Sequence, residues 1–99
     1  MAAYMIIALK INDGAREKFI SGYGAAVPAL VKKYGGEYIL VAPGAELLEG
    51  TLNGYTSMAV SKWPSKADVL KFWNSEGYAD VKKLREGLGD CEVFVVEAP

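Results

Sequence analysis

The sequence predicts an α+β domain in which one antiparallel sheet carries two helices on one of its faces. Four apolar runs have the length of β-strands, and they cover residues 4–11, 37–41, 55–63 and 92–97. Two segments between these runs place apolar residues three or four positions apart, as one face of a helix requires. The order is therefore β-α-β-β-α-β, which is that of a ferredoxin-like sandwich. We expect a single domain over residues 1–99.

The first helical segment is expected to bend. Asp13 can cap its start, and Gly35-Gly36 can end it, because glycine accepts the left-handed conformation that is common at helix ends. Pro28 lies inside the helical pattern, and an internal proline removes a backbone hydrogen bond. We therefore expect a bend near Ala25 that opens space beside the sheet.

The connection between the second and third strands contains several turn signals. A turn or bulge is expected at residues 42–44, and residues 46–49 can form a short strand. Asn53-Gly54 is a strong hairpin signal, because both residues tolerate the positive φ of a type I′ turn.

The second helical segment, residues 65–85, contains two helix starts. Ser65 and Asp68 form a capping-box pattern, and Ser75 repeats the signal ten residues later. Arg85 follows within the last turns of this segment. The apolar residues after the second start have helical spacing and are expected to face the core: Tyr78, Val81, Leu84 and Leu88.

Both faces of the predicted sheet are apolar. In the last strand, Val93 and Val95 point to one face while Phe94 and Val96 point to the other. An antiparallel sheet with one face in water normally alternates apolar and polar residues. We therefore expect a second copy of the chain to cover the face opposite the helices, in a two-fold homodimer.

The composition excludes several classes of partner and chemistry. Eleven basic and twelve acidic residues give a net charge of −1, which provides no electrostatic surface for nucleic acid or an anionic membrane. Cys91 is the only cysteine, so no internal disulfide is possible and a reducing cytoplasm is the expected compartment. The chain has no histidine, the commonest general base and metal ligand. We expect no metal and no cofactor.

Several short motifs are spread over the whole chain: Gly35-Gly36 after Tyr34, Leu48-Glu49-Gly50, Trp63-Pro64-Ser65, Asn74-Ser75-Glu76-Gly77-Tyr78, and Arg85. Together they resemble the uncharacterised family called domain of unknown function thirteen-thirty. Gly77 stands where a helix former is more usual in that family, and Gly14 where proline often opens the first helix. The resemblance implies a dimeric α+β barrel, in which two ferredoxin-like sheets pack back to back. Relatives in that group include cofactor-independent monooxygenases, isomerases, dehydratases and haem-handling enzymes, so the fold alone settles no function.

Arg85 is the leading candidate for a binding residue. Its helical neighbours are expected to face the core, and a guanidinium there can bind a carboxylate through two parallel hydrogen bonds. The family resemblance points to the same arginine. Trp73, Tyr78 and Tyr23 are expected to form the apolar wall of a helix–sheet pocket for a small apolar or aromatic organic acid. Whether the protein is an enzyme stays open, and no catalytic residue is assigned.

A structural interpretation stands beside each of these candidates. Arg85 can instead pair with a carboxylate such as Glu49, or simply extend its charged end to water, in a protein whose only role is to form a dimer. Trp73 and the tyrosines can pack in the core. Trp73-Asn74 also resembles the Trp and Asn that some cofactor-independent monooxygenases use, but without the histidine that accompanies them. Cys91 has no evident basic neighbour in the sequence and is expected to be inert.

Overall fold

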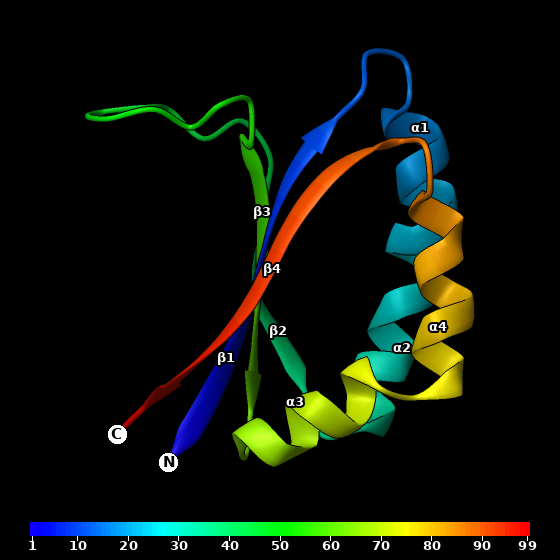
Figure 1. Ribbon diagram of the computed structural model, residues 1–99, viewed down its shortest axis with the longest axis vertical. Helices are drawn as coiled ribbons and strands as arrows, with labels where there is room; N and C mark the ends of the chain where they lie inside the picture. Colours follow the sequence, from blue (N-terminus) through cyan, green and yellow to red (C-terminus); the bar gives the residue numbers. More distant parts are fainter.

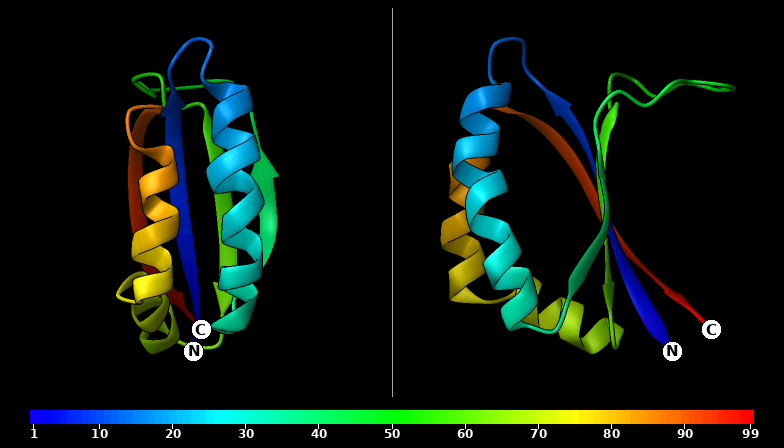
Figure 2. Two further views of the ribbon diagram at one scale, coloured as in Figure 1. Left: turned by 90° about the vertical axis from the view of Figure 1, so that its right-hand side faces the viewer. Right: turned by 180° about the vertical axis from the view of Figure 1, so that it is seen from behind.

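The fold is a four-stranded antiparallel sheet with its helices on one face. The computed structural model describes residues 1–99. The strands stand in the order β2-β3-β1-β4, with the bounds β1 Ala2–Ile11, β2 Glu37–Ala42, β3 Ser57–Trp63 and β4 Gly89–Ala98. Figures 1 and 2 show the helices gathered on one side of the sheet and the other side uncovered. The predicted α+β ferredoxin-like sandwich is confirmed.

Three of the strands begin at other residues than predicted, and β1 starts two residues early, at Ala2. β4 starts at Gly89, where the chain pairs with Ile11 at the end of β1. A Cβ at Gly89 would collide with the carbonyl oxygen of Lys10, so glycine lets the last strand pair along the whole length of β1. β3 starts at Ser57 and not at Tyr55, because the amide of Tyr55 closes a turn by donating to the carbonyl of Leu52 at 2.9 Å.

The first helical segment is built from three pieces, α1 Arg16–Phe19, the π-helical η1 Ile20–Gly24 and α2 Ala25–Lys33. The π-helical part ends at Gly24, next to Ala25 where a bend was expected, and Figure 2 shows the segment changing direction. Pro28 has no amide hydrogen for the carbonyl of Gly24, so the α-helical ladder cannot run unbroken through this region. Gly35 ends the segment with a φ of 97°, as predicted.

The predicted cap at Asp13 is wrong. The residue before α1 is Ala15, which makes no side-chain cap, and its amide donates to the carbonyl of Asn12 at 3.0 Å. Gly14 has a φ of 79°, and this turn separates Asp13 from the start of the helix. The side-chain amide of Asn12 instead donates to the carbonyl of Gly87 at 3.2 Å, which ties this turn to the one before β4.

The second helical segment contains α3 Lys66–Trp73, α4 Glu76–Lys82 and the 3₁₀ turn η2 Lys83–Arg85. Both predicted starts are confirmed. The hydroxyl of Ser65 accepts a hydrogen bond from the amide of Asp68 at 3.2 Å, and the hydroxyl of Ser75 accepts one from the amide of Tyr78 at 3.1 Å. The carboxylate of Asp68 accepts from the Ser65 hydroxyl at 2.9 Å. The carboxylate does not bond the amide of Ser65, which a complete capping box would require.

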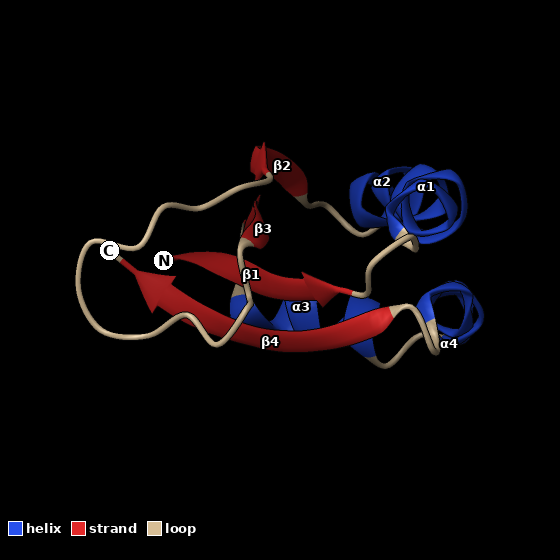
Figure 3. Cartoon of the chain, turned by 90° about the horizontal axis from the view of Figure 1, so that it is seen from above, coloured by secondary structure: helices blue, strands red, loops and turns tan.

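Residues 43–56, which we call the arm, connect β2 to β3 and extend away from the body of the protein. The short strand predicted at residues 46–49 is wrong, because this stretch pairs with no other strand. Asn53 and Gly54 have φ values of 51° and 84°, as the predicted turn requires. Figure 3 shows the arm on the side of the sheet opposite α1 and α2. Leu48 near its middle is 92% exposed.

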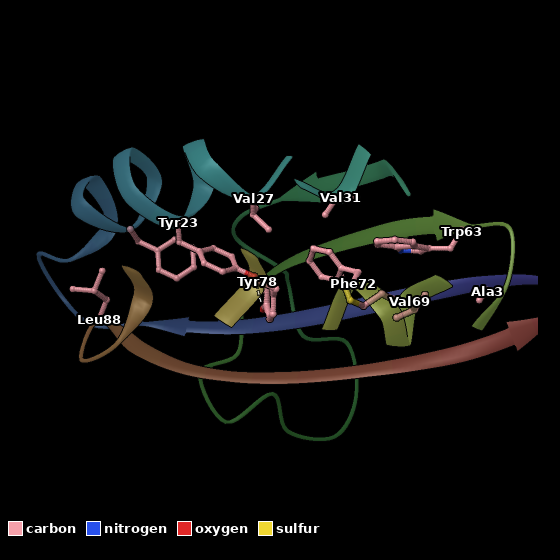
Figure 4. Close-up of a cluster of buried hydrophobic side chains, with 11 residues drawn as sticks. Ala3, Tyr23, Val27, Val31, Trp63, Val69, Phe72, Tyr78 and Leu88 are labelled. Carbon is pink, nitrogen blue, oxygen red and sulfur yellow. Dashed lines mark hydrogen bonds between the residues drawn. The ribbon is translucent and has the colours of Figure 1, made fainter. Parts of the chain in front are cut away.

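The core lies between the helices and the sheet and is rich in aromatic rings (Figure 4). Phe72 is fully buried, with its ring centroid 5.2 Å from that of Trp63 and 4.5 Å from that of Tyr78. Leu84 was expected on the same face but is 45% exposed. Arg85 follows Tyr78 by seven residues, or two helical turns, so it takes the inward position and Leu84 beside it faces solvent.

The opposite face of the sheet, which we call the open face, carries apolar side chains that no helix covers. In β4 the outward residues Phe94 and Val96 are 50% and 44% exposed, and in β2 Leu40 is 45% exposed. Strand pairing places further apolar residues on this face: Tyr4, Ile6, Ala8, Met58 and Val60. None of the helices has the length and apolar character that crossing a membrane requires.

Candidate functional site

Arg85, Tyr78 and Tyr23 meet between the two helical segments, and we call them the Arg85 cluster. The hydroxyl oxygens of Tyr23 and Tyr78 are 2.9 Å apart and share a hydrogen bond, which Figure 4 shows. The Nη2 of Arg85 donates to the hydroxyl of Tyr78 at 3.4 Å, and the guanidinium carbon lies 5.3 Å from the centre of the Tyr23 ring. Three of the four residues predicted for a binding site therefore come together.

Arg85 has no carboxylate partner. The one ion pair in the structure joins Lys83 and Asp80 at 3.9 Å, on the exposed side of the helix. The predicted alternative partner, Glu49, lies exposed in the arm. A guanidinium has five N–H donors, but the bond to Tyr78 is its one hydrogen bond to a side-chain oxygen, and its Nε is buried without a partner. Buried donors normally find an acceptor, so the guanidinium retains capacity to bind an anion.

Arg85 and Tyr23 each keep one charge state at physiological pH. Burial lowers the pKa of Arg85, but the hydrogen bond to Tyr78 and the electrostatic effect of Tyr78, Cys91 and Tyr23 outweigh it and raise that pKa above its ordinary value. Burial, with a smaller contribution from Tyr78, raises the pKa of Tyr23 far above its usual 10. The cluster therefore offers a permanent cation beside the neutral hydroxyl of Tyr23.

Cys91 lies beside Arg85, which the sequence did not indicate. Burial raises the pKa of the Cys91 thiol, while the charges of Arg85 and Lys82 act in the opposite direction without cancelling it. The expectation that Cys91 has no basic neighbour is wrong, but the group remains a thiol at neutral pH. The turn between η2 and β4 brings the two residues together, and the signal in the sequence is the Gly87-Leu88-Gly89 stretch that reverses the chain.

Trp73 connects the Arg85 cluster to an apolar cavity. Its ring centroid lies 5.0 Å from that of Tyr78. The Nζ of Lys82 lies over the Trp73 ring, 4.8 Å from the centroid of that ring. Trp73 is half-buried and lines a cavity of about 150 Å³ between α3 and β4. The walls of this cavity are entirely apolar: Met5, Val69, Leu70, Trp73, Val93, Phe94 and Val95. Arg85 does not line it.

The buried tyrosines predict a loss of stability at high pH. Burial raises the pKa of Tyr38 to about 12, and that of Tyr23 is higher still, whereas an unfolded chain titrates near 10. Above pH 10 the unfolded state binds fewer protons than the folded state, so the free energy of unfolding should fall. Denaturant titrations at pH 9, 10 and 11 measure this fall in the free energy of unfolding. The double variant Tyr23→Phe/Tyr38→Phe should show a shallower decline, and equal slopes would contradict the explanation.

Solved structures with the same fold share little sequence with this chain. A protein of unknown function from Rhodopseudomonas palustris has a TM-score of 0.76 and 15% identity, covering 99% of this chain and 82% of that one. A dimeric ferredoxin-like protein of unknown function from Jannaschia sp. CCS1 has a TM-score of 0.78 and 14% identity, and the match covers 99% of this chain and 100% of that one. SnoaB, a cofactor-independent oxygenase from Streptomyces nogalater, has a TM-score of 0.69 and 13% identity, and the match covers 99% of this chain and 93% of that one.

No curated protein matches the chain. A family model does, and it matches residues 2–99. That match spans the sheet, both helical segments and the whole Arg85 cluster. The chain therefore belongs to the family described as Domain of unknown function (DUF1330).

Proposed function

We propose that the protein binds a small apolar or aromatic organic acid, with the carboxylate of the ligand on Arg85. The observation that carries this proposal is a half-buried guanidinium that has no carboxylate partner and one buried unpaired Nε. Tyr78 and Tyr23 are buried behind the guanidinium and hold it in place. The carboxylate would use the remaining donors in the two-bond geometry that arginine favours.

The body of the acid would extend along β4 toward the cavity beside Trp73. Arg85 lies near Cys91, and Val93 lines the cavity. Cys91 and Val93 are two residues apart and face the same side of β4, so they are about 7 Å apart along the strand. A ligand with one aromatic ring and a carboxylate spans that separation. The apolar walls and one cation are the combination that small-molecule pockets commonly use.

The same site allows two other interpretations, a protein that only forms a dimer and an enzyme. A module whose only role is dimer formation leaves the unpaired donors of Arg85 without an explanation. An enzyme would need more than the cluster supplies on its own, because its ionisable groups have pKa values displaced away from neutrality. Arg85 and Tyr78 could still stabilise negative charge on a bound molecule. The oxygenase activity named for SnoaB belongs to that protein, and the likeness concerns the fold.

We further propose that two copies pack through their open faces to form a homodimer, in the reducing cytoplasm that a single cysteine favours. Phe94, Val96 and Leu40 would leave water in that arrangement. The arm supports the same arrangement, because it extends on the side of the open face and carries the exposed Leu48. The protein compared above from Jannaschia sp. CCS1 is itself described as dimeric.

Benzoate and phenylacetate, with benzyl alcohol as an uncharged comparison, test the ligand proposal by calorimetry and thermal shift. Both acids should stabilise the parent protein by binding its folded state. Arg85→Ala should weaken binding about tenfold to a hundredfold, the usual worth of a charged hydrogen bond. Arg85→Lys keeps the charge but loses the paired geometry, so it should bind weakly.

The matched control is Lys83→Ala, which removes an exposed cation two residues away and should leave binding unchanged. Arg85→Ala should also lower the free energy of unfolding by only about 1–2 kcal/mol, since it removes one hydrogen bond from a charged donor. A loss of about 3–5 kcal/mol, as for a broken buried ion pair, with no acid stabilising the parent protein, would leave the dimer-only interpretation.

A further inference from the structure

A second apolar space lies beneath the first helical segment, on the other side of the molecule from β4. Two adjoining cavities, of about 320 Å³ and about 120 Å³, occupy the space between this segment and strands β1, β2 and β3. They share five wall residues: Leu9, Phe19, Gly24, Val41 and Ala59. We call the two together the helix–sheet channel. Its walls run along β1 from Ile11 to Ile7, which is about 14 Å of strand.

The channel has a cation at one end. Arg16, the first residue of α1, lines the larger cavity, and its Nη2 donates to the hydroxyl of Ser57 at 3.0 Å. Ser57 is itself buried at the start of β3. No carboxylate lies within 4.0 Å of Arg16. Arg16 and Ser57 are the only polar side chains that line the larger cavity, so the mouth attracts an anion and the interior accepts hydrocarbon.

Aromatic residues line the inner end of the channel. Tyr23 and Tyr38 line the smaller cavity together with Pro28, where the bend of the helix leaves room. The hydroxyl of Tyr23 is bonded to Tyr78 in the Arg85 cluster. The Tyr23 side chain therefore stands between the channel and Arg85, and the two binding regions are separate.

We propose that the helix–sheet channel binds a linear aliphatic carboxylate of medium chain length, with the carboxylate on Arg16 and the alkyl chain along Leu9 and Ala59. An elongated apolar channel fits a flexible chain better than it fits a compact ring. Each methylene group that leaves water should strengthen binding about fourfold. The Ser57 hydroxyl holds the guanidinium at the mouth, where its other donors remain free.

Calorimetric titration of the intact protein with hexanoate, octanoate and decanoate tests the proposal. The affinity should rise by about sixteenfold for each two methylene groups until the channel is filled. Arg16→Gln should weaken decanoate binding about tenfold or more, and Arg16→Lys should restore part of it. Lys18→Gln is the matched control, since it removes a neighbouring exposed charge that does not line the channel. Binding that ignores chain length, or that survives Arg16→Gln unchanged, would overturn the proposal.

Two further variants test whether decanoate binds in the helix–sheet channel or at Arg85. Ala59→Leu fills the wall shared by both cavities and should abolish decanoate binding while benzoate binding persists, because Ala59 does not line the cavity beside β4 and Tyr23 separates the channel from Arg85. Arg85→Gln should leave decanoate binding intact. If Arg85→Gln instead removes decanoate binding, the acid occupies the first site and the channel proposal fails. If Ala59→Leu does not fold, the series of hexanoate, octanoate and decanoate and the variants Arg16→Gln and Arg16→Lys still test whether the channel binds the acid.

Discussion

Replacing Phe72 by alanine is expected to lower the free energy of unfolding by about 3–5 kcal/mol. Phe72 is fully buried, and its ring contacts those of Trp63, Tyr78 and Tyr34 with centroids 5.2, 4.5 and 6.2 Å away. Truncation removes the largest shared contact between α3 and the aromatic core, and the rings around it are held by their own neighbours, so the cavity cannot close. Denaturant unfolding at fixed protein concentration measures the loss.

The matched control for this variant is Leu70→Ala, on the same helix. Leu70 is 43% exposed, so its truncation should lower the free energy of unfolding by about 1 kcal/mol or less. Equal losses for the two variants would mean that Phe72 is not the centre of the packing. A loss at Phe72 below about 1 kcal/mol would contradict the described core.

Replacing Phe94 by aspartate is expected to convert the proposed homodimer into a folded monomer. Phe94 lies on the open face of β4, half exposed in the protomer, and the proposed two-fold packing would bury it. A carboxylate placed there would have to leave water without a partner, which strongly disfavours association. Light scattering at micromolar concentration gives the mass, and circular dichroism shows whether the fold is retained.

The control for the dimer variant is Leu84→Asp. Leu84 is exposed to a similar extent, but on the helical layer away from the open face. It should leave the dimer intact. A parent protein with the mass of one protomer would end the dimer proposal, and so would a Phe94→Asp variant that remains fully dimeric. If the proposal holds, the thermal midpoint of the parent should rise with protein concentration.

Local signals in the sequence predicted most of the fold. The caps at Ser65 and Ser75 depend on bonds to residues three positions away, so their pattern is visible in the chain. Asp13 has the same residue type as a cap, but the left-handed turn at Gly14 places it outside the helix. Residues 46–49 have the composition of a strand, yet no partner strand is within reach to satisfy their backbone.

Part of the candidate site was also predictable from local spacing in the sequence. Arg85 and Tyr78 are two helical turns apart, so their contact follows from spacing within one segment. The contacts of Tyr23 and Cys91 with this pair depend on how distant elements pack. Arg16 was missed altogether, because a charged residue at the start of a helix resembles an ordinary exposed one until β3 brings Ser57 against it.

The most direct test of Arg85 as the anchor of an organic acid is the ¹⁵N–¹H signal of its Nε group during titration with benzoate. The chain has two arginines, Arg16 and Arg85, so the spectrum contains two such signals, and Arg16→Lys assigns them. We predict that the Arg85 signal shifts and saturates as benzoate is added, while the Arg16 signal stays in place. An Arg85 signal that does not move with benzoate or phenylacetate at any concentration would contradict the account.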